Sequence, residues 1–377
     1  MKIGIVCYPT FGGSGVVATE LGIALAQKGH EVHFITYSQP VRLDFFSDRI
    51  FYHEVSVSDY PLFDFQPYEL VLTSKLVDVV EHEKLDLLHV HYAIPHASAA
   101  FMAKQILASK GIHIPYITTL HGTDITLVGR DPSFEPVITF AINESDAVTA
   151  VSESLKQDTY KHFAVSREIK VIPNFINMKE YNLSHPECSK LTYAPAGEKI
   201  MVHVSNFRKV KRVEDVLRVF DKVRKAVPTK LILVGDGPER NNVEKLCREL
   251  DTCQDIRSLG KLTNPEQVLS ISDLFILTSE TESFGLAALE AMAAKVPVIS
   301  TNTGGQPEVN IHGVTGYLSD VGDIEDMAKN AISILKDEAT LARFKINAFE
   351  QAQKFDVPLI LPMYEELYQE VLQSQMI

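Results

Sequence analysis

Short apolar runs alternate with amphipathic segments along the first half of the chain. The runs "KIGIVCY", "EVHFITY", "LDLLHVH", "PYITTLH" and "AVTAVS" are rich in β-branched residues, as is typical of strands buried on both faces. Helical patterns lie between them, and "GVVATELGIALAQKG" ends at Gly29, a residue suited to close a helix. This alternation predicts a parallel, doubly wound α/β sheet.

The alternation stops around several prolines and then starts again with "IMVHVS", "LILVGDG", "DLFILTS" and "VPVIST". A chain of 377 residues is also long enough for two cores. We therefore predict an N-terminal domain over 1–170, a linker over 171–198, a C-terminal domain over 199–357, and a helix over 358–377 that packs on the first domain. Ligands bind beyond the carboxyl ends of strands in such sheets, so we expect two Rossmann-like domains facing each other across a cleft.

Charge and composition exclude several classes of partner. The formal net charge of -13 repels nucleic acids and anionic membranes, so we expect neither a nucleic-acid partner nor stable membrane association. The first apolar run is too short for a signal peptide or a membrane span, which predicts a cytoplasmic protein. The four cysteines lack metal-ligand spacing, and we expect free thiols. The sequence leaves open whether the protein forms a homo-oligomer.

A glycine-rich turn follows the first predicted strand. Gly12, Gly13 and Gly15 precede a helix, where bare amides can receive an anion, although the same glycines could also serve only a tight turn. Their spacing is not Gly-x-Gly-x-x-Gly, and the next strand ends in "ITYSQ" without a ribose-binding carboxylate. A nicotinamide or flavin enzyme is therefore disfavoured.

Polar residues also follow later strands of the first half. His89 is placed on the opposite strand face from His91, as a core residue. No nucleophile elbow is present, which argues against a triad hydrolase. The cleft candidates, each of which could instead make only a structural hydrogen bond, are His91, Tyr92, His121, Thr123, Asp124 and Arg130.

Two stretches of the second half suit a phosphorylated ligand. "VSNFRKVKR" concentrates Arg208, Lys209, Lys211 and Arg212 after a strand, either as solvated charges or as a diphosphate site. "SETESFGLAALEAM" combines a helix N-terminus with two glutamates, Glu282 and Glu290, which can accept hydroxyl groups unless they are only solvated or paired charges. Together these groups match a nucleotide sugar.

The motifs "ESFGLAALEAM" and "TGGQPEV", with the histidine of "TTLH" and the basic segment, resemble the family-four retaining glycosyltransferases, and the resemblance covers nearly the whole chain. It implies the two-domain GT-B fold. "CYPTFGGSGVVATELG", "HYAIPHASAA" and "LHGTDITLVGRDPSF" are most similar to members that transfer N-acetylglucosamine from UDP-N-acetylglucosamine to the hydroxyl of L-malate, the first step of bacillithiol biosynthesis. Other hydroxylated or phosphorylated acceptors, or a non-catalytic nucleotide-sugar binding protein, are the alternatives.

The resemblance also implies residue roles. Glu290 would hold the ribose and Glu282 the sugar hydroxyls, while His121 would meet the sugar near its 6-hydroxyl. This chain has Ser205-Asn206 where many relatives have Gly-Arg, so the diphosphate arginine is assigned to Arg208. The implied catalytic residues are Glu282, His121, Arg208 and Lys211, and the implied donor-binding residues are Gly13, Asn206, Arg208, Lys211, Lys261, Leu262, Glu282, Phe284, Gly285, Leu286 and Glu290.

An acceptor with two carboxylates needs cations or donors in the first domain. Arg130 is the leading candidate, supported by Ser14, Tyr92 and Thr123. No nucleophile is evident once the glutamates are assigned to donor hydroxyls, and the resemblance implies that the leaving β-phosphate takes the acceptor's proton. No Asp-x-Asp metal clamp is visible, and we predict neither a required metal nor another cofactor.

Overall fold

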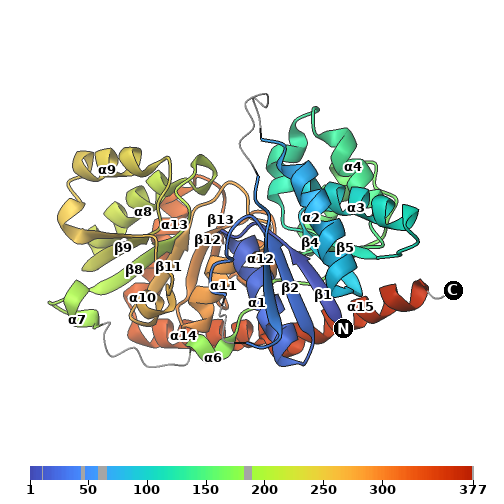
Figure 1. The fold of residues 1–377 in the computed structure, drawn as a ribbon. Helices are drawn as coiled ribbons and strands as arrows, with labels where there is room; N and C mark the ends of the chain where they lie inside the picture. Colours follow the sequence, from blue (N-terminus) through green and yellow to red (C-terminus); the bar gives the residue numbers. More distant parts are fainter. Residues whose placement is uncertain (11, 44–46, 58–65, 182–188, 376–377) are drawn as a thin grey trace. The chain divides into compact units, whose positions relative to one another are not determined.

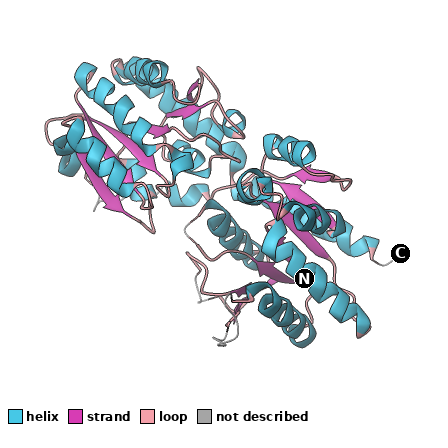
Figure 2. Cartoon of the chain, turned by 90° about the horizontal axis from the view of Figure 1, so that it is seen from above, coloured by secondary structure: helices cyan, strands magenta, loops and turns pink. Residues whose placement is uncertain are grey.

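The computed structural model describes residues 1–10, 12–43, 47–57, 66–181 and 189–375. The chain divides into two compact units: unit 1 contains Met1–Asn174 and Val357–Ile377, and unit 2 contains Phe175–Asp356. Each unit has a parallel sheet with helices on both faces (Figures 1 and 2). The predicted doubly wound α/β architecture is confirmed.

Unit 1 is built on a seven-stranded sheet in the order β3-β2-β1-β4-β5-β6-β7. Its central strands are the apolar runs of the sequence, and β4 and β5 are buried along their whole length, as expected for parallel strands covered on both faces. The elements are β1 (Lys2–Val6), α1 (Gly13–Gln27), β2 (Glu31–Thr36), β3 (Ile50–Glu54), α2 (Tyr68–Glu83), β4 (Leu87–His91), η1 (Ala93–Ala97), α3 (Ser98–Ser109), β5 (Tyr116–Leu120), η2 (Thr123–Leu127), η3 (Val128–Arg130), α4 (Glu135–Glu144), β6 (Ala147–Ala150), α5 (Glu153–His162), β7 (Ile169–Val171) and α15 (Val357–Ser374).

The C-terminal helix α15 belongs to unit 1. Its Tyr364 and Tyr368 are fully buried, and the Tyr368 hydroxyl lies 2.7 Å from Nδ1 of His89 on β4. The Glu365 carboxylate lies 3.0 Å from Nε2 of His30. These contacts bring the end of the chain against the central strands of the N-terminal sheet.

Unit 2 repeats the plan with a six-stranded sheet in the order β10-β9-β8-β11-β12-β13. Apolar faces of α8, α9 and α13 pack on β8, β9 and β11 in one core. The elements are α6 (Met178–Tyr181), α7 (Lys190–Tyr193), β8 (Lys199–Val204), η4 (Lys209–Lys211), α8 (Val213–Ala226), β9 (Thr229–Val234), α9 (Arg240–Glu249), η5 (Cys253–Asp255), β10 (Ile256–Gly260), α10 (Glu266–Ser270), β11 (Leu274–Leu277), α11 (Leu286–Ala293), β12 (Val298–Thr301), α12 (Gln306–Val309), β13 (Gly316–Ser319), α13 (Ile324–Leu335), α14 (Glu338–Ala352) and η6 (Gln353–Phe355).

The chain passes from unit 1 to unit 2 between Asn174 and Phe175 and returns between Asp356 and Val357. Most of the segment assigned to a linker, residues 175–198, therefore groups with unit 2, where it contributes the short helices α6 and α7.

The expectation of free thiols is wrong for two of the four cysteines. Cys247 and Cys253 form a disulfide, with their Cα atoms 5.2 Å apart. Cys247 lies in the last turn of α9, and the chain turns back through Thr252 to begin η5 at Cys253. This reversal brings together two residues whose spacing alone gives no pairing signal.

Within the described ranges, none of the helices combines the length and the apolar character that crossing a bilayer requires.

Candidate active site

The strands β8 and β11 are neighbours in unit 2, and the loops that follow them are joined at the carboxyl edge of the sheet. The hydroxyl of Thr278, just after β11, donates to the carbonyl oxygens of Lys211 and Arg212, each at 3.0 Å. The amide of Glu280 donates to the Val210 carbonyl at 2.8 Å. The basic segment, residues 208–212, and the turn that carries Glu282, residues 279–285, are far apart in sequence. These hydrogen bonds therefore join them into one surface.

An ion pair lies at the centre of this surface. Nζ of Lys211 is 2.5 Å from Oε1 of Glu282, and the Ser279 hydroxyl donates to the same oxygen at 2.8 Å. The Lys211 and Glu282 side chains are only 20% and 12% exposed, so each charge is poorly solvated without the other. A phosphate and a sugar hydroxyl could each take one partner of this pair.

The loop that contains Gly304 and Gly305 packs directly on the turn that carries Glu282. A Cβ at Gly304 would lie 1.9 Å from the Glu282 carbonyl oxygen, and one at Gly305 would lie 2.4 Å from that of Ser283. A Cβ at Gly285 would lie 2.1 Å from Nε2 of Gln306. Only glycine permits this close approach.

Gln306 was not singled out by the sequence analysis, although it belongs to the quoted "TGGQPE". Its side chain is fully buried, and neither its amide nitrogen nor its oxygen has a hydrogen-bond partner within the described part of the chain. Buried amides usually have partners. No sequence signal shows that this side chain turns inward beside Gly285.

Helix α11 begins directly after the glutamate turn. Gly285, its N-terminal flanking residue, has φ 95°, and no side chain among the described residues caps the helix. The amides of Ala288 and Leu289 already donate to the Gly285 carbonyl oxygen, so within the described ranges the amides of Leu286 and Ala287 are the ones that can receive an anion. Glu290 lies in the second turn and is 7% exposed, whereas Phe284 buries its ring against Phe355 with the centroids 5.6 Å apart.

The remaining predicted donor residues lie along the same edge of unit 2. Asn206 and Arg208 are exposed in the loop after β8, and Leu286 is half-buried in the first turn of α11. Lys261 and Leu262 follow β10, which lies two strands away from β8. Lys261 is exposed and Leu262 is half-buried. The structure thus brings Lys211 and Glu282 into contact and leaves Arg208 and Lys261 as exposed cations.

In unit 1, Tyr92 and Ser14 meet at the corresponding edge. The Tyr92 hydroxyl donates to Oγ of Ser14 at 2.6 Å, joining the end of β4 to the first turn of α1. Burial raises the pKa of Tyr92 to about 12, so this hydroxyl is neutral. Gly13, the first residue of α1, is exposed beside them.

Three buried imidazole rings form a stack next to Tyr92. Nδ1 of His91 and Nε2 of His121 are 2.7 Å apart, so one ring donates to the other. The rings of His89 and His91 are also stacked, with their centroids 4.6 Å apart. The expectation that His89 points to the opposite face is wrong, because residues two apart on a strand share a face.

Burial keeps these rings neutral. Burial lowers the pKa of His89 and of His121 to about 3 and that of His96 to about 4. Nε2 of His91 has no hydrogen-bond partner within the described ranges, which favours a bare Nε2 and a proton on Nδ1, donated to His121. The proton of His121 then lies on its own Nδ1, where it can donate to a hydroxyl.

A buried carboxylate fixes the loops around these rings. Asp124 accepts from the amides of Ala93 at 2.9 Å and Gly122 at 3.1 Å, and burial raises its pKa to about 6. Thr123 lies half-buried beside it at the start of η2. Arg130 ends η3, but its side chain lies outside the described part of the structure.

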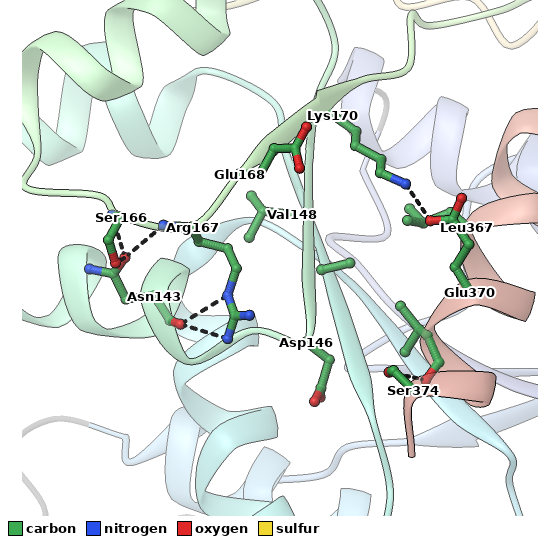
Figure 3. A pocket seen from close by; sticks show the side chains of 12 residues that line it. Asn143, Asp146, Val148, Ser166, Arg167, Glu168, Lys170, Leu367, Glu370 and Ser374 are labelled. Carbon is green, nitrogen blue, oxygen red and sulfur yellow. Dashed lines mark hydrogen bonds and ion pairs between the residues drawn. The ribbon is translucent and has the colours of Figure 1, made fainter. Parts of the chain in front are cut away.

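A pocket of about 550 Å³ lies elsewhere in unit 1, near the amino ends of β6 and β7 and beside α15 (Figure 3). Its Lys170 and Glu370 are paired, and Arg167 donates to the Asn143 carbonyl oxygen. None of the predicted site residues lines it. Ligands of parallel sheets bind at the opposite, carboxyl ends, so the candidate active site is not this pocket.

Two doubly wound domains with polar and charged groups after the central strands define a glycosyltransferase of GT-B fold, and the comparisons agree. Residues 11–180 match the family "Glycosyltransferase Family 4", and residues 189–351 match "Glycosyl transferases group 1". The chain is 48% identical, over 99% of its length and 98% of the relative's, to the N-acetyl-alpha-D-glucosaminyl L-malate synthase of Bacillus anthracis. The chain belongs to the family-four glycosyltransferases, as the sequence motifs predicted.

Solved structures show the same fold. The sucrose-phosphate synthase of Thermosynechococcus elongatus matches with a TM-score of 0.82 at 21% identity, covering 99% of this chain and all of that one. HepE of Anabaena, solved in complex with UDP-glucose, matches with a TM-score of 0.80 at 22% identity, covering 99% and 100%.

Proposed function

We propose that this glycosyltransferase moves N-acetylglucosamine from UDP-N-acetylglucosamine to the hydroxyl of L-malate with retention at the anomeric carbon, as the first step of bacillithiol biosynthesis. The observation that carries the proposal is the similarity to the malate synthase, at 48% identity over almost the full length of both chains. The Bacillus anthracis relative is named for this product, and a structural relative was solved with a UDP-sugar.

The geometry of unit 2 supports a nucleotide-sugar donor. Diphosphate needs several positive groups at once, and Lys211, Arg208 and the open amides of α11 are collected at one sheet edge. Glu282 can then accept sugar hydroxyls and Glu290 ribose hydroxyls. In this proposal the donor separates the Lys211–Glu282 pair, with phosphate replacing the carboxylate beside Lys211 and a hydroxyl replacing the ammonium beside Glu282.

The chemistry needs no protein nucleophile. The bond between the anomeric carbon and the phosphate oxygen breaks, and the malate oxygen bonds to the same carbon on the face that the diphosphate leaves. The malate hydroxyl proton passes to the departing β-phosphate. Lys211, Arg208 and the α11 amides stabilise the charge that develops on the leaving group. The roles of His121 and Gly13 toward the donor stay predictions.

Unit 1 supplies the acceptor residues in this proposal. Ser14 and Tyr92 present neutral hydroxyls at the end of β4, with Thr123 on the next loop, and the cation that a dicarboxylate requires is assigned to Arg130. We expect Arg130→Ala to raise the KM for malate by about tenfold or more, the scale of one lost charged hydrogen bond. Arg167→Ala, an arginine of the distant pocket, is the matched control. An unchanged KM for malate in folded Arg130→Ala would rule out this assignment.

The test of the whole proposal is turnover by the purified protein. UDP-N-acetylglucosamine is incubated with and without L-malate, and UDP release, product mass and anomeric configuration are followed. Malate-dependent UDP release with an α-linked N-acetylglucosaminyl malate is the expected result. Donor binding without malate-dependent release would overturn malate as the acceptor and direct the search to other hydroxylated anions.

We also propose that transfer requires no metal, because protein cations and helix amides occupy the role that a metal would take. The same assay in excess chelator should keep its full rate. A rate that collapses and returns with added divalent ion would reject this part of the proposal.

A further inference from the structure

Two histidines and a glutamate come together at the edge of the unit 1 sheet. His33 lies on β2, His53 on the edge strand β3 and Glu83 at the C-terminal end of α2. One ligand atom from each, a ring nitrogen or a carboxylate oxygen, lies within 4.8 Å of the others. Among the described residues, this is the single group of three such side chains.

The hydrogen bonds of His33 prepare one nitrogen for a metal. Nε2 of His33 lies 3.1 Å from the carboxylate of Glu31, which can only accept, so Nε2 carries the proton. Nδ1 is therefore the nitrogen with the free electron pair. Nζ of Lys2 lies 2.6 Å from the same carboxylate of Glu31, and this ion pair holds the carboxylate beside His33. A carboxylate behind a histidine is the usual support for a metal-ligating ring.

The distance between the rings suits a shared ion. Nδ1 of His33 and Nε2 of His53 are 2.9 Å apart. Two nitrogens at about 2.1 Å from an ion are about 3.0 Å apart in cis octahedral positions and about 3.4 Å apart in a tetrahedron. Without an ion a proton of His53 fills this space, and a metal would replace it.

The surroundings of the rings favour the ligating form. His33 is fully buried, and Phe51 stacks on its ring with the centroids 4.8 Å apart, which fixes its plane. His53 is half-buried on the edge strand, so it is the ring that can turn to aim its electron pair at the ion.

We propose that His33, His53 and Glu83 form a structural site for a divalent transition metal, with Glu31 as the carboxylate that orients His33. The two imidazoles and one carboxylate match Zn²⁺, Co²⁺ and related ions of intermediate softness. The ion would tie the edge strand β3 to β2 and to the end of α2. None of the residues assigned to donor or acceptor belongs to it, so the site is independent of the proposed transfer reaction.

Zn²⁺ binding to the full chain tests this site. Protein freed of metal with a chelator is titrated with Zn²⁺ in competition with a chromophoric chelator. We expect one equivalent to bind, His53→Gln to weaken binding by about 100-fold or more, and Glu31→Gln to weaken it by about 10- to 100-fold. His82→Gln, an exposed histidine next to Glu83, is the matched control and should bind as the wild type does.

A second measurement covers the case in which His53→Gln fails to fold. Glu83→Gln changes a half-buried residue at a helix end, and Zn²⁺ should raise the Tm of the wild type but not of this variant. Co²⁺ should give visible d–d bands with the wild type and lose them with Glu83→Gln. Absence of stoichiometric binding to the wild type would overturn the site, as would Zn²⁺ affinity and a Tm response that Glu83→Gln and His53→Gln leave unchanged.

Discussion

In unit 1 the side chains after the central strands are stacked neutral rings and hydroxyls, whereas in unit 2 they are an ion pair beside open backbone amides. His89, His91 and His121 are buried without charge, and only the buried Asp124 among their neighbours titrates near pH 6. In unit 2, Lys211 and Glu282 lie 2.5 Å apart as an ion pair. The same architecture therefore places mainly neutral rings and hydroxyls after the central strands of unit 1, and an ion pair after those of unit 2.

The largest expected effect comes from removing the cation of unit 2. Lys211→Ala leaves Glu282 without its partner and removes positive charge from the leaving diphosphate. We expect kcat/KM to fall about 10²- to 10³-fold, or about 3 to 4 kcal/mol of transition-state stabilisation. Lys209→Ala, in the same short helix but exposed, is the control and should change kcat/KM little. Equal losses in the two variants would show that general positive charge, rather than the pair, matters.

We expect low pH to destabilise unit 1 more than unit 2. His89, His96 and His121 of unit 1 have pKa values of about 3 to 4 in the folded protein, below the ordinary value of 6.5. Unfolding therefore takes up protons below about pH 6.5, and the stability that these rings contribute is lost as pH falls toward 4. The expected loss is about 1 kcal/mol per histidine for each pH unit below about 6.

Asp124 and His203 also bear on this acid effect. Asp124 opposes it, because its pKa is raised to about 6 and the folded state gains from its protonation, whereas His203 is the comparable ring in unit 2, with a pKa lowered to about 4. Hydrogen exchange at pH 7 and pH 5 should show amides of unit 1 opening more than those of unit 2. If amides of both units opened equally at pH 5, the prediction that acid destabilises unit 1 more than unit 2 would be wrong.

Two alanine variants can distinguish the steric cost of a Cβ beside Glu282 from the conformational cost of a positive φ. Gly304 and Gly313 both have positive φ, at 56° and 75°, but a Cβ meets the Glu282 carbonyl only at Gly304 and meets nothing within 4 Å at Gly313. Both alanine variants carry the conformational cost of about 1 kcal/mol. Gly304→Ala should be about 2 kcal/mol less stable than Gly313→Ala in denaturant unfolding and should also lose donor affinity. Indistinguishable variants would mean that the loop yields without displacing Glu282.

The smallest expected effect concerns the neutral hydroxyls of unit 1. Tyr92→Phe removes the hydrogen bond to Ser14 but keeps the ring that packs beside His121, with the centroids 5.3 Å apart. A severalfold rise in the KM for malate is expected, corresponding to about 1 kcal/mol for one neutral hydrogen bond. Tyr37→Phe, at a ring that is 39% exposed, is the control. If Tyr92→Phe lowered kcat/KM as much as Lys211→Ala, the neutral hydroxyls of unit 1 would matter as much as the ion pair of unit 2, contrary to the prediction.

The sequence by itself determined the α/β class, the central strands of both sheets, the turn that carries Glu282 and the helix that carries Glu290. Continuous apolar runs mark strands buried on both faces, and glycines mark turns where a Cβ does not fit. The edge strand β3 gave no such signal, because only its first residue, Ile50, is buried and the other four are partly or fully exposed. The strand β7 is only three residues long, too short for a periodic pattern.

Tertiary structure decided which side chains meet. The pairing of Lys211 with Glu282, the burial of Gln306 beside Gly285 and the approach of His33 to His53 each join segments that are separate along the chain. Local patterns report whether a residue is buried, but contacts across strands depend on strand order and register, which a single sequence does not display. The same reason explains why the sequence could only propose candidate site residues, whereas the partners of their side chains became visible only in the fold.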